Sequence, residues 1–131
     1  MFSTKGRYAL RVLTDIAEQN KNNYVPLKDI AKRQCISKKY LESIVKKLVD
    51  ANLLTGISGK NGGYKLVKAP SKYSIGEILA ATEGSIAPVA CISNGSAICD
   101  RKNSCKSLPL WIELNDLISK FLYKKKLSDI I

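Results

Sequence analysis

Three of the four cysteines gather in one stretch of small and polar residues, VACISNGSAICDRKNSCKSLPLW, at positions 89–111. Seven residues separate Cys91 from Cys99, five separate Cys99 from Cys105, and the chain contains no histidine. Thiolates ligate iron–sulfur clusters and zinc, and a pair of thiols can oxidise to a disulfide. Four interpretations are open: an iron–sulfur cluster, a zinc ion, a thiol–disulfide switch, or a loop without a ligand. The missing histidine weakens the zinc interpretation, because many tetrahedral zinc sites use one.

The charge of the chain is unevenly distributed. The formal net charge is +11, with 14 Lys and Arg against 5 Asp and Glu in residues 1–70, and 8 against 6 in residues 71–131. A basic segment joined to a nearly neutral one predicts that the first binds a polyanion and that the second has another role. The chain therefore divides into a basic region over residues 1–70 and a nearly neutral region over residues 71–131.

Length and hydropathy indicate the class of protein. A chain of 131 residues corresponds to one domain, and a hydrophobic content of 45% is ordinary for a globular protein. No run approaches the roughly 18 apolar residues of a membrane span, and the start MFSTKGRYAL lacks the apolar core of a signal peptide. These features predict a cytoplasmic protein with no membrane partner. In that reducing compartment, grouped cysteines indicate metal binding or redox chemistry more than structural disulfides.

Helical periodicity in the first half predicts a helix-turn-helix. Apolar residues recur at helical spacing in YALRVLTDIAEQ, and PLKDIAKRQ follows as a short helix opened by Pro26. The next segment, CISKKYLESIVKKLVDAN, has Ser37 as its N-cap and an inward face of Leu41, Ile44, Val45 and Leu48. Cys35 falls between the two helices, and we expect it to be a turn residue without a ligand role.

The outward face of the second of these helices carries polar and basic side chains. In a helix-turn-helix the N-terminal turn of this helix enters the major groove, where polar groups contact base edges and lysines contact phosphates. An ordinary solvated helix face is the alternative. The residues of the helix-turn-helix that we expect to contact DNA are Lys28, Ser37, Lys38, Lys39, Tyr40, Glu42 and Ser43.

A glycine-rich hairpin is predicted directly after the helix-turn-helix. Two β-prone arms, LLTGI and YKLVK, flank SGKNGG, and we expect Asn61, Gly62 and Gly63 to supply the positive φ angles of a tight turn. A helix-turn-helix followed by a basic hairpin predicts a winged helix. Lys60 and Asn61 would then lie at the wing tip, on a phosphate or in the minor groove. The order of these features favours DNA binding over the solvated-face alternative.

The second half predicts a capped helix before the cysteines and a long amphipathic helix after them. Ser74 and Glu77 form a capping-box pattern in SIGEILAATEG, and Gly84 should end that helix. Apolar residues then recur every three to four positions in LPLWIELNDLISKFLYKKK. A small domain can hardly cover so long a stripe, so we expect the helix to pair with its counterpart in a second copy, and a core helix is the alternative. The expected interface residues are Leu110, Trp111, Leu114, Leu117, Ile118, Phe121 and Leu122.

The expected fold is mainly α with a small β-hairpin, a winged helix-turn-helix plus a long C-terminal dimerisation helix. We expect one compact protomer, with a DNA-binding region over residues 1–70 and a cysteine-loop sensor and dimerisation region over residues 71–131. A two-fold homodimer would present two recognition helices to a palindromic operator in double-stranded DNA. An enzyme is not expected, because the chain has no C-x-x-C pair, no histidine base and no nucleotide-binding glycine motif.

Five motifs follow one another along the chain: STKGRYAL, LKDIAKRQCISKKYLESIVKKL, GKNGGYKL, SIGEIL and the final LW…FL…LSDI. Together they resemble the IscR/NsrR/CymR family of bacterial winged-helix transcription regulators. The resemblance implies a homodimer with crossed long helices, which regulates genes of iron–sulfur cluster assembly, nitric-oxide stress or cysteine metabolism. It also implies DNA contacts at Ser37, Lys39, Tyr40, Glu42 and Ser43, and at the wing residues Ser58, Gly59, Lys60, Asn61 and Gly62. Ser58 stands where many relatives have arginine, and Lys60 replaces that arginine only as a point charge.

The resemblance favours an iron–sulfur cluster, 2Fe-2S or 4Fe-4S, held by Cys91, Cys99 and Cys105. The x7/x5 spacing resembles that of some nitric-oxide sensors, whereas TKGRYAL is nearer to the assembly and cysteine-metabolism regulators. Leu108 and Arg7 occupy the positions at which relatives supply a fourth ligand, and neither side chain ligates a cluster. Asp100, Ser107, an oxygen of the partner subunit, a water or a small thiol remain candidates. A cluster with so weak a fourth ligand would be labile and readily lost on purification.

We expect the state of the cluster to change DNA binding. Ordering residues 91–105 would shift the separation or tilt of the two recognition helices and so alter operator affinity. Glu42 would then influence site choice, because a carboxylate that faces DNA disfavours operators that offer it no donor. The rival interpretation is a cluster-free repressor controlled by a thiol–disulfide switch or by a partner protein, as in the cysteine-metabolism branch of the family.

Overall fold

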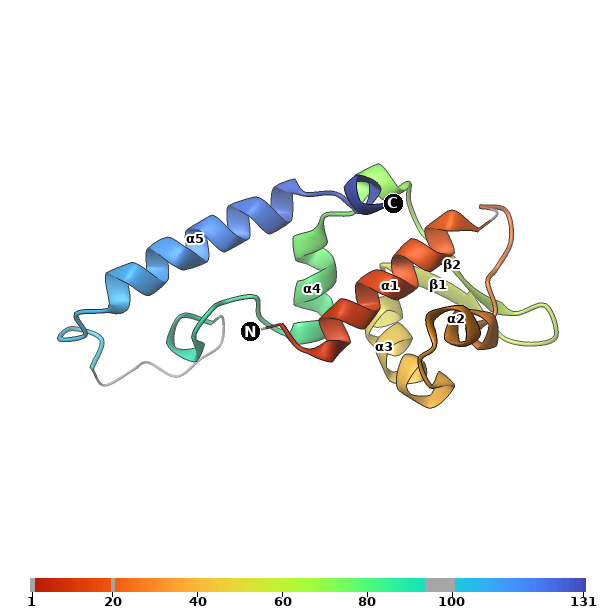
Figure 1. Cartoon of the computed structure of the whole chain (residues 1–131), viewed down its shortest axis with the longest axis horizontal. Coiled ribbons are helices and arrows are strands. Elements are labelled where there is room, and N and C mark those ends of the chain that lie inside the picture. The colour runs from red at the N-terminus through yellow and green to blue at the C-terminus, as the bar shows by residue number, and fades with distance from the viewer. Residues whose placement is uncertain (1, 20, 94–100) are drawn as a thin grey trace.

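The computed structural model describes residues 2–19, 21–93 and 101–131. The elements, in chain order, are α1 (Thr4–Glu18), α2 (Leu27–Gln34), α3 (Lys38–Asp50), β1 (Leu54–Ile57), β2 (Gly63–Leu66), α4 (Ile75–Glu83) and α5 (Leu108–Lys124) (Figure 1). Short 3-10 turns occupy Pro70–Lys72, Ala90–Ile92 and Leu127–Ile130. The predicted fold, mainly helical with one small hairpin, is confirmed. Among the described helices, none combines the length and the apolar character needed to cross a bilayer.

Helices α1 to α4 pack around one apolar core, to which the C-terminal segment also contributes. The predicted inward face of α3 is buried along its whole length. The large side chains that are fully enclosed include Leu13, Ile30, Leu41, Ile44, Leu48, Tyr73, Ile78 and Leu127. Because this set includes residues on both sides of position 70, the expected DNA-binding and sensor regions share the same core.

Local signals in the sequence set most helix ends. Ser37 caps α3 by accepting, through Oγ, a hydrogen bond of 3.2 Å from a backbone N–H of the first turn. Ser74 and Glu77 form the predicted capping box, with N–H to oxygen distances of 3.1 and 2.9 Å. Gly84 ends α4 with a φ of 81°. Pro26, expected inside the first turn of α2, is instead the N-cap of that helix.

Strands β1 and β2 form the antiparallel wing hairpin, joined by residues 58–62. The expected positive φ is confirmed at Gly63 (151°), but it was wrong for Asn61 and Gly62, and Gly59 (105°) has a positive φ that was not expected. The physical reason is the length of the connection, which does not have the two-residue geometry that demands positive φ at its centre. An added Cβ at Gly63 would also lie within 2.3 Å of a backbone carbonyl oxygen. Position 63 therefore requires glycine for two reasons, the positive φ and the close approach of the Val25 carbonyl.

Two sets of hydrogen bonds fix the base of the wing. Val25 N–H donates to the carbonyl of Tyr64 at 2.8 Å, and Tyr64 N–H donates to the carbonyl of Val25 at 2.9 Å, which ties β2 to the chain before α2. The buried Tyr73 hydroxyl donates to the carbonyl of Leu53 at 2.7 Å and accepts from the N–H of Val67 at 2.9 Å. Leu53 precedes β1 and Val67 follows β2, so Tyr73 joins both ends of the hairpin.

Helix α5 extends away from the other helices and meets them chiefly near its C-terminal end (Figure 1). There the N–H of Ile75 donates to the carbonyl of Lys125 at 2.9 Å, and the N–H of Leu127 donates to the carbonyl of Tyr73 at 3.0 Å. Gly76 allows a close approach, because an added Cβ would lie 2.7 Å from the ring of Tyr123. The N-terminal end of α5 follows the cysteine loop, residues 91–105, so this helix links that loop to the start of α4.

The apolar residues of α5 remain largely accessible in the single chain. No residue of α5, all of which the structure describes, is buried. The most exposed of the predicted interface residues are Leu110, Leu117 and Phe121, at 58%, 62% and 61%. The other four are half-buried: Trp111, Leu114, Ile118 and Leu122. The core-helix alternative therefore fails for at least one side of α5, since a core helix would enclose that side.

Candidate DNA-binding surface and cysteine loop

The exposed face of α3 divides into three strips. A helix with about 3.6 residues per turn places Lys39, Ser43 and Lys46 along the middle. One edge consists of Lys38 and Glu42, and the opposite edge consists of Tyr40 and Lys47. All of these residues are exposed except Tyr40, which is half-buried. The helix thus offers its predicted DNA-contact residues on one continuous surface, and their contact with DNA stays a prediction.

The two serines of this surface are already hydrogen-bonded, and this limits what each can do. Ser37 Oγ accepts from the N–H of Tyr40, so its hydroxyl proton remains available for a phosphate oxygen. Ser43 Oγ donates to the carbonyl of Tyr40 at 2.7 Å, so it is placed to accept. An accepting hydroxyl suits a base amino group better than a phosphate, which has no proton to donate.

The edge of α3 formed by Lys38 and Glu42 faces the wing across a hollow. The lining includes three lysines from α2, α3 and the wing, together with two carboxylates. Those residues among the lining that were predicted to contact DNA are Lys28, Lys38, Glu42, Ser58, Gly59, Lys60 and Gly62. Asn61 is exposed at the wing tip. Three separate segments of sequence therefore converge on one concave surface, with the hairpin projecting beside α2 and α3 (Figure 1).

The other edge of α3 meets α1 through aromatic and basic side chains that the sequence pattern did not single out. The rings of Tyr8 and Tyr40 meet edge to face, with centroids 5.7 Å apart. The Cζ atoms of Arg11 and Arg7 lie 5.1 and 6.0 Å from the centre of the Tyr8 ring. The available signal was the i, i+4 spacing of the two arginines in GRYALR, which places them on one side of α1.

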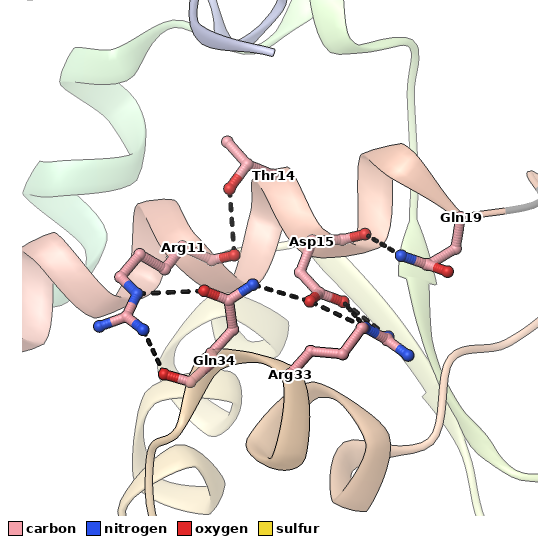
Figure 2. A network of polar contacts seen from close by, with 6 residues as sticks. All are labelled: Arg11, Thr14, Asp15, Gln19, Arg33 and Gln34. Carbon is pink, nitrogen blue, oxygen red and sulfur yellow. Dashed lines mark hydrogen bonds and ion pairs between the residues drawn. The ribbon is translucent and has the colours of Figure 1, made fainter.

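A buried carboxylate joins α1 to the end of α2 (Figure 2). Asp15, only 3% exposed, accepts from Arg33 with N to O distances of 2.7 and 3.0 Å, and from Gln34 Nε2 at 2.8 Å. The hydrogen bond to Asp15 raises the pKa of Arg33. Gln34 accepts in turn from Arg11, through its side-chain oxygen at 3.1 Å and through its backbone carbonyl. Helix α1 thus holds the last turn of α2 at two points.

Cys35 follows that last turn and forms the turn of the helix-turn-helix. Its backbone is left-handed, with φ of 55° and ψ of 44°, and its side chain is exposed. The N–H of Ile36 donates to the carbonyl of Ala31 at 3.1 Å, which closes the turn. The expected place of Cys35 in the turn is confirmed, and the absence of a ligand role stays a prediction.

The last turn of α4 contacts both α1 and α3. Glu83 Oε1 accepts from the N–H groups of Ser3 and Gly6 at 2.7 and 3.0 Å, and from Ser3 Oγ at 2.8 Å. A carboxylate here suits the positive end of α1. Lys47 Nζ of α3 donates to the carbonyl of Thr82 at 3.3 Å. From this turn the chain continues through residues 84–90 to the cysteine loop.

Two of the three clustered cysteines lie in the described residues. Cys91 is exposed in the turn Ala90–Ile92, and Cys105 is half-buried shortly before α5. Cys99 and Asp100, both candidate ligands, lie outside the described residues. In the part of the chain that the structure describes, no three His, Cys, Asp or Glu side chains gather around a metal position. The three-cysteine ligand set stays a prediction.

Ser107 stabilises the thiolate form of Cys105. Its Sγ lies 3.4 Å from Ser107 Oγ, and the hydrogen bonds from the hydroxyl and the N–H of Ser107 lower the pKa of the Cys105 thiol. A lower pKa increases the fraction of thiolate, which is the form that ligates metals and attacks disulfides. Ser107, a candidate fourth ligand, is therefore already a neighbour of Cys105.

The whole chain matches one family of regulators. The match is to Rrf2, iron-dependent transcriptional regulator, over residues 2–131. The chain belongs to this family. It is 36% identical to the HTH-type transcriptional regulator IscR of Vibrio cholerae over 129 residues, which are 98% of this chain and 73% of that protein. It is 33% identical to IscR of Escherichia coli, over 98% of this chain and 78% of that protein.

Solved structures extend the similarity to the fold. CymR (YrzC), the global cysteine regulator of B. subtilis, superimposes with a TM-score of 0.81 at 32% identity, over 99% of this chain and 95% of that one. IscR of T. potens gives 0.77 at 28% identity, over 99% and 85%. The predicted resemblance to IscR and CymR regulators is confirmed. The chain is a DNA-binding transcription regulator of the winged-helix type and not an enzyme.

Proposed function

We propose that this regulator acts as a cytoplasmic homodimer that binds a palindromic operator and senses iron–sulfur, nitric-oxide or redox status through its cysteine loop. Residues 1–70 bind DNA in this proposal, and residues 71–131 provide the sensor and the dimer interface. The observation that carries it is the hollow between α3 and the wing, where predicted contacts from three segments converge. The side chains around that hollow and on the middle strip of α3 match the requirements of a major-groove surface.

The proposed interface between copies is the exposed apolar side of α5. Leu110, Leu117 and Phe121 recur at i, i+7 and i+11, which keeps them on one side of the helix. Burial of apolar surface contributes about 25 cal/mol per Å², so covering this side with the same helix of a second copy is favourable. A two-fold arrangement of this kind would hold two α3 helices at a fixed separation on DNA.

The proposed cofactor is an iron–sulfur cluster, 2Fe-2S or 4Fe-4S, ligated by Cys91, Cys99 and Cys105. The donor chemistry fits, because thiolates are the ligands such clusters require and the thiolate of Cys105 is favoured by Ser107. Similarity to IscR regulators supports the same assignment. When bound, the cluster supplies a centre that oxygen or nitric oxide can alter.

The last turn of α4 provides a route by which the loop can influence DNA binding. Glu83 is hydrogen-bonded to the start of α1, and the carbonyl of Thr82 is hydrogen-bonded to Lys47 of α3. A change of loop conformation that moves this turn would therefore change the position of α3 relative to its counterpart in the dimer. A shift in the population of two such positions changes operator affinity.

The test compares binding to a duplex that wild-type protein selects from a randomised pool. The proteins are cluster-loaded wild type, apo wild type and Cys99→Ala, with Cys35→Ala as the matched control for loss of a thiol. We expect cluster-loaded and apo protein to differ by about fivefold or more in affinity, Cys99→Ala to match the apo protein, and Cys35→Ala to match wild type. Equal affinities and equal site preferences for all four would reject the coupling.

The second candidate is a cluster-free repressor controlled by a disulfide switch or by a partner protein. It is favoured by the similarity to CymR, including a TM-score of 0.74 at 29% identity, over 97% of this chain and 92% of that one, to the oxidised form from Staphylococcus aureus. The lowered pKa of Cys105 also suits thiol exchange. Anaerobic reconstitution with iron and sulfide separates the candidates, because a brown product with visible absorption supports the cluster and a colourless one supports the switch.

A further inference from the structure

A cluster of basic and aromatic side chains lies where α1 meets the first turn of α3. Tyr8 packs edge to face against Tyr40, and Arg7 and Arg11 lie 6.0 and 5.1 Å from the centre of its ring. The two arginines are exposed and the two tyrosines are half-buried. The tyrosine pair therefore forms an apolar support that holds two guanidinium groups at the surface.

This cluster lies on the flank of α3 that faces away from the wing. Lys38 and Glu42 line the hollow beside the wing, whereas Tyr40 is on the opposite edge of the same helix. Figure 1 shows the same arrangement, with the wing on one side of α3 and the first turns of α1 on the other. A helix inserted in the major groove, about 12 Å wide, has a sugar–phosphate strand on each flank. The wing can contact the sugar–phosphate strand on one flank, and the basic and aromatic side chains of α1 lie where they can contact the strand on the other flank.

The charges of Arg7 and Arg11 are not neutralised by an ion pair within the described residues, whereas Arg33 on α2 is paired with Asp15. Arg11 uses Nε and Nη2 for the oxygens of Gln34, which fixes its orientation and leaves Nη1 for another acceptor. A guanidinium group oriented in this way suits a phosphate oxygen. Arg7, which is exposed beside the same Tyr8 ring, adds a second positive charge.

We propose that Arg7 and Arg11, supported by Tyr8 and Tyr40, form a second phosphate-binding site for the DNA backbone, on the flank of α3 opposite the wing. This inference rests on the proposed docking of α3 in the major groove. The ligand is a phosphodiester of duplex DNA, contacted without regard to base sequence. Tyr40 is half-buried because its ring packs against that of Tyr8.

The test measures affinity against salt concentration by fluorescence anisotropy, using full-length protein and a labelled duplex of mixed sequence. Each phosphate contact contributes about 0.9 to the slope of log affinity against log salt. Arg7→Ala should therefore reduce the slope by about 0.9 per protomer, and Arg7→Lys should restore most of it. Arg7 is the preferred target, because Arg11 also holds the last turn of α2.

Lys72→Ala is the matched control, because Lys72 is an exposed cation in the turn Pro70–Lys72, close to the C-terminal segment and away from the start of α1 (Figure 1). Its slope should equal that of wild type. Equal slopes for Arg7→Ala and Lys72→Ala, with normal binding by wild type, would overturn the second phosphate site alone. Wild-type protein that binds no duplex at low salt would instead overturn the proposed DNA docking.

Discussion

Helices α1 to α4 and helix α5 have the same kind of apolar sequence pattern, but the pattern is buried in the first group and largely exposed in α5. Leu48 in α3 and Leu117 in α5 both belong to apolar stripes at helical spacing, yet the first is fully enclosed and the second is 62% exposed. The α1–α4 body surrounds its stripes with neighbouring elements, whereas α5 extends from that body with one side uncovered (Figure 1). Periodicity thus predicts a helix and its apolar side, and the surrounding elements determine whether that side becomes core or interface.

The largest expected difference between the two regions is in stability. Leu48→Ala should lower the free energy of unfolding by about 2–5 kcal/mol, because it leaves a cavity in a closed core. Leu117→Ala should act mainly through association, so it should weaken the dependence of Tm on protein concentration. Urea and thermal unfolding over a range of concentrations measure both effects. Equal destabilisation by the two changes at low concentration would contradict the contrast between core and interface.

A smaller difference is expected for carboxylates in the two regions. Asp15→Asn should cost about 1–3 kcal/mol, because the buried hydrogen bonds to Arg33 and Gln34 lose their charged acceptor. Glu113→Gln, on the exposed surface of α5, should stay within about 0.5 kcal/mol of wild type. Urea unfolding of both variants gives the comparison. If Asp15→Asn is as stable as wild type, these hydrogen bonds do not stabilise the contact between α1 and the end of α2.

The smallest expected effect concerns two tyrosines and appears at high pH. Burial raises the pKa of the Tyr73 phenol above its ordinary value. The folded protein therefore holds this proton more tightly than the unfolded chain, so the free energy of unfolding is unaffected well below about pH 10 and falls as pH rises through about 10 towards the folded pKa. Tyr73→Phe should lose this part of the alkaline decline, and Tyr123→Phe, 46% exposed on α5, should keep it. The free energy of unfolding is measured from pH 8 to 11 for both variants and wild type. If Tyr73→Phe shows the same decline as wild type, the decline does not come from the Tyr73 phenol.

Features with local causes were predictable from the sequence. Ser37 and Gly84 mark the start of α3 and the end of α4 because capping depends on residues within one turn. The apolar spacing of α3 and α5 likewise predicts their inner and outer sides. The wing was predictable as a hairpin with a positive φ at Gly63. The other positive φ lies at Gly59 and not at Asn61 or Gly62, because the connection over residues 58–62 is longer than a two-residue turn.

Features that join distant segments were not predictable in the same way. Tyr73 is hydrogen-bonded to both ends of the wing, and Glu83 is hydrogen-bonded to the start of α1. These partners are separated in sequence and meet only in the folded chain. Asp15 gave a partial signal, since a carboxylate beside the apolar residues of an amphipathic helix requires a buried partner. Nothing in the sequence identified that partner as the end of α2.

The most direct test of the account measures the molecular mass of wild-type protein and of Phe121→Glu, alone and with duplex operator, by sedimentation equilibrium. The account predicts a wild-type dimer that binds one duplex with two protomers, and a Phe121→Glu monomer that keeps its fold by circular dichroism but binds the same duplex much more weakly. A wild-type protein that is monomeric, together with a Phe121→Glu variant that binds the duplex as tightly as wild type does, would contradict the account.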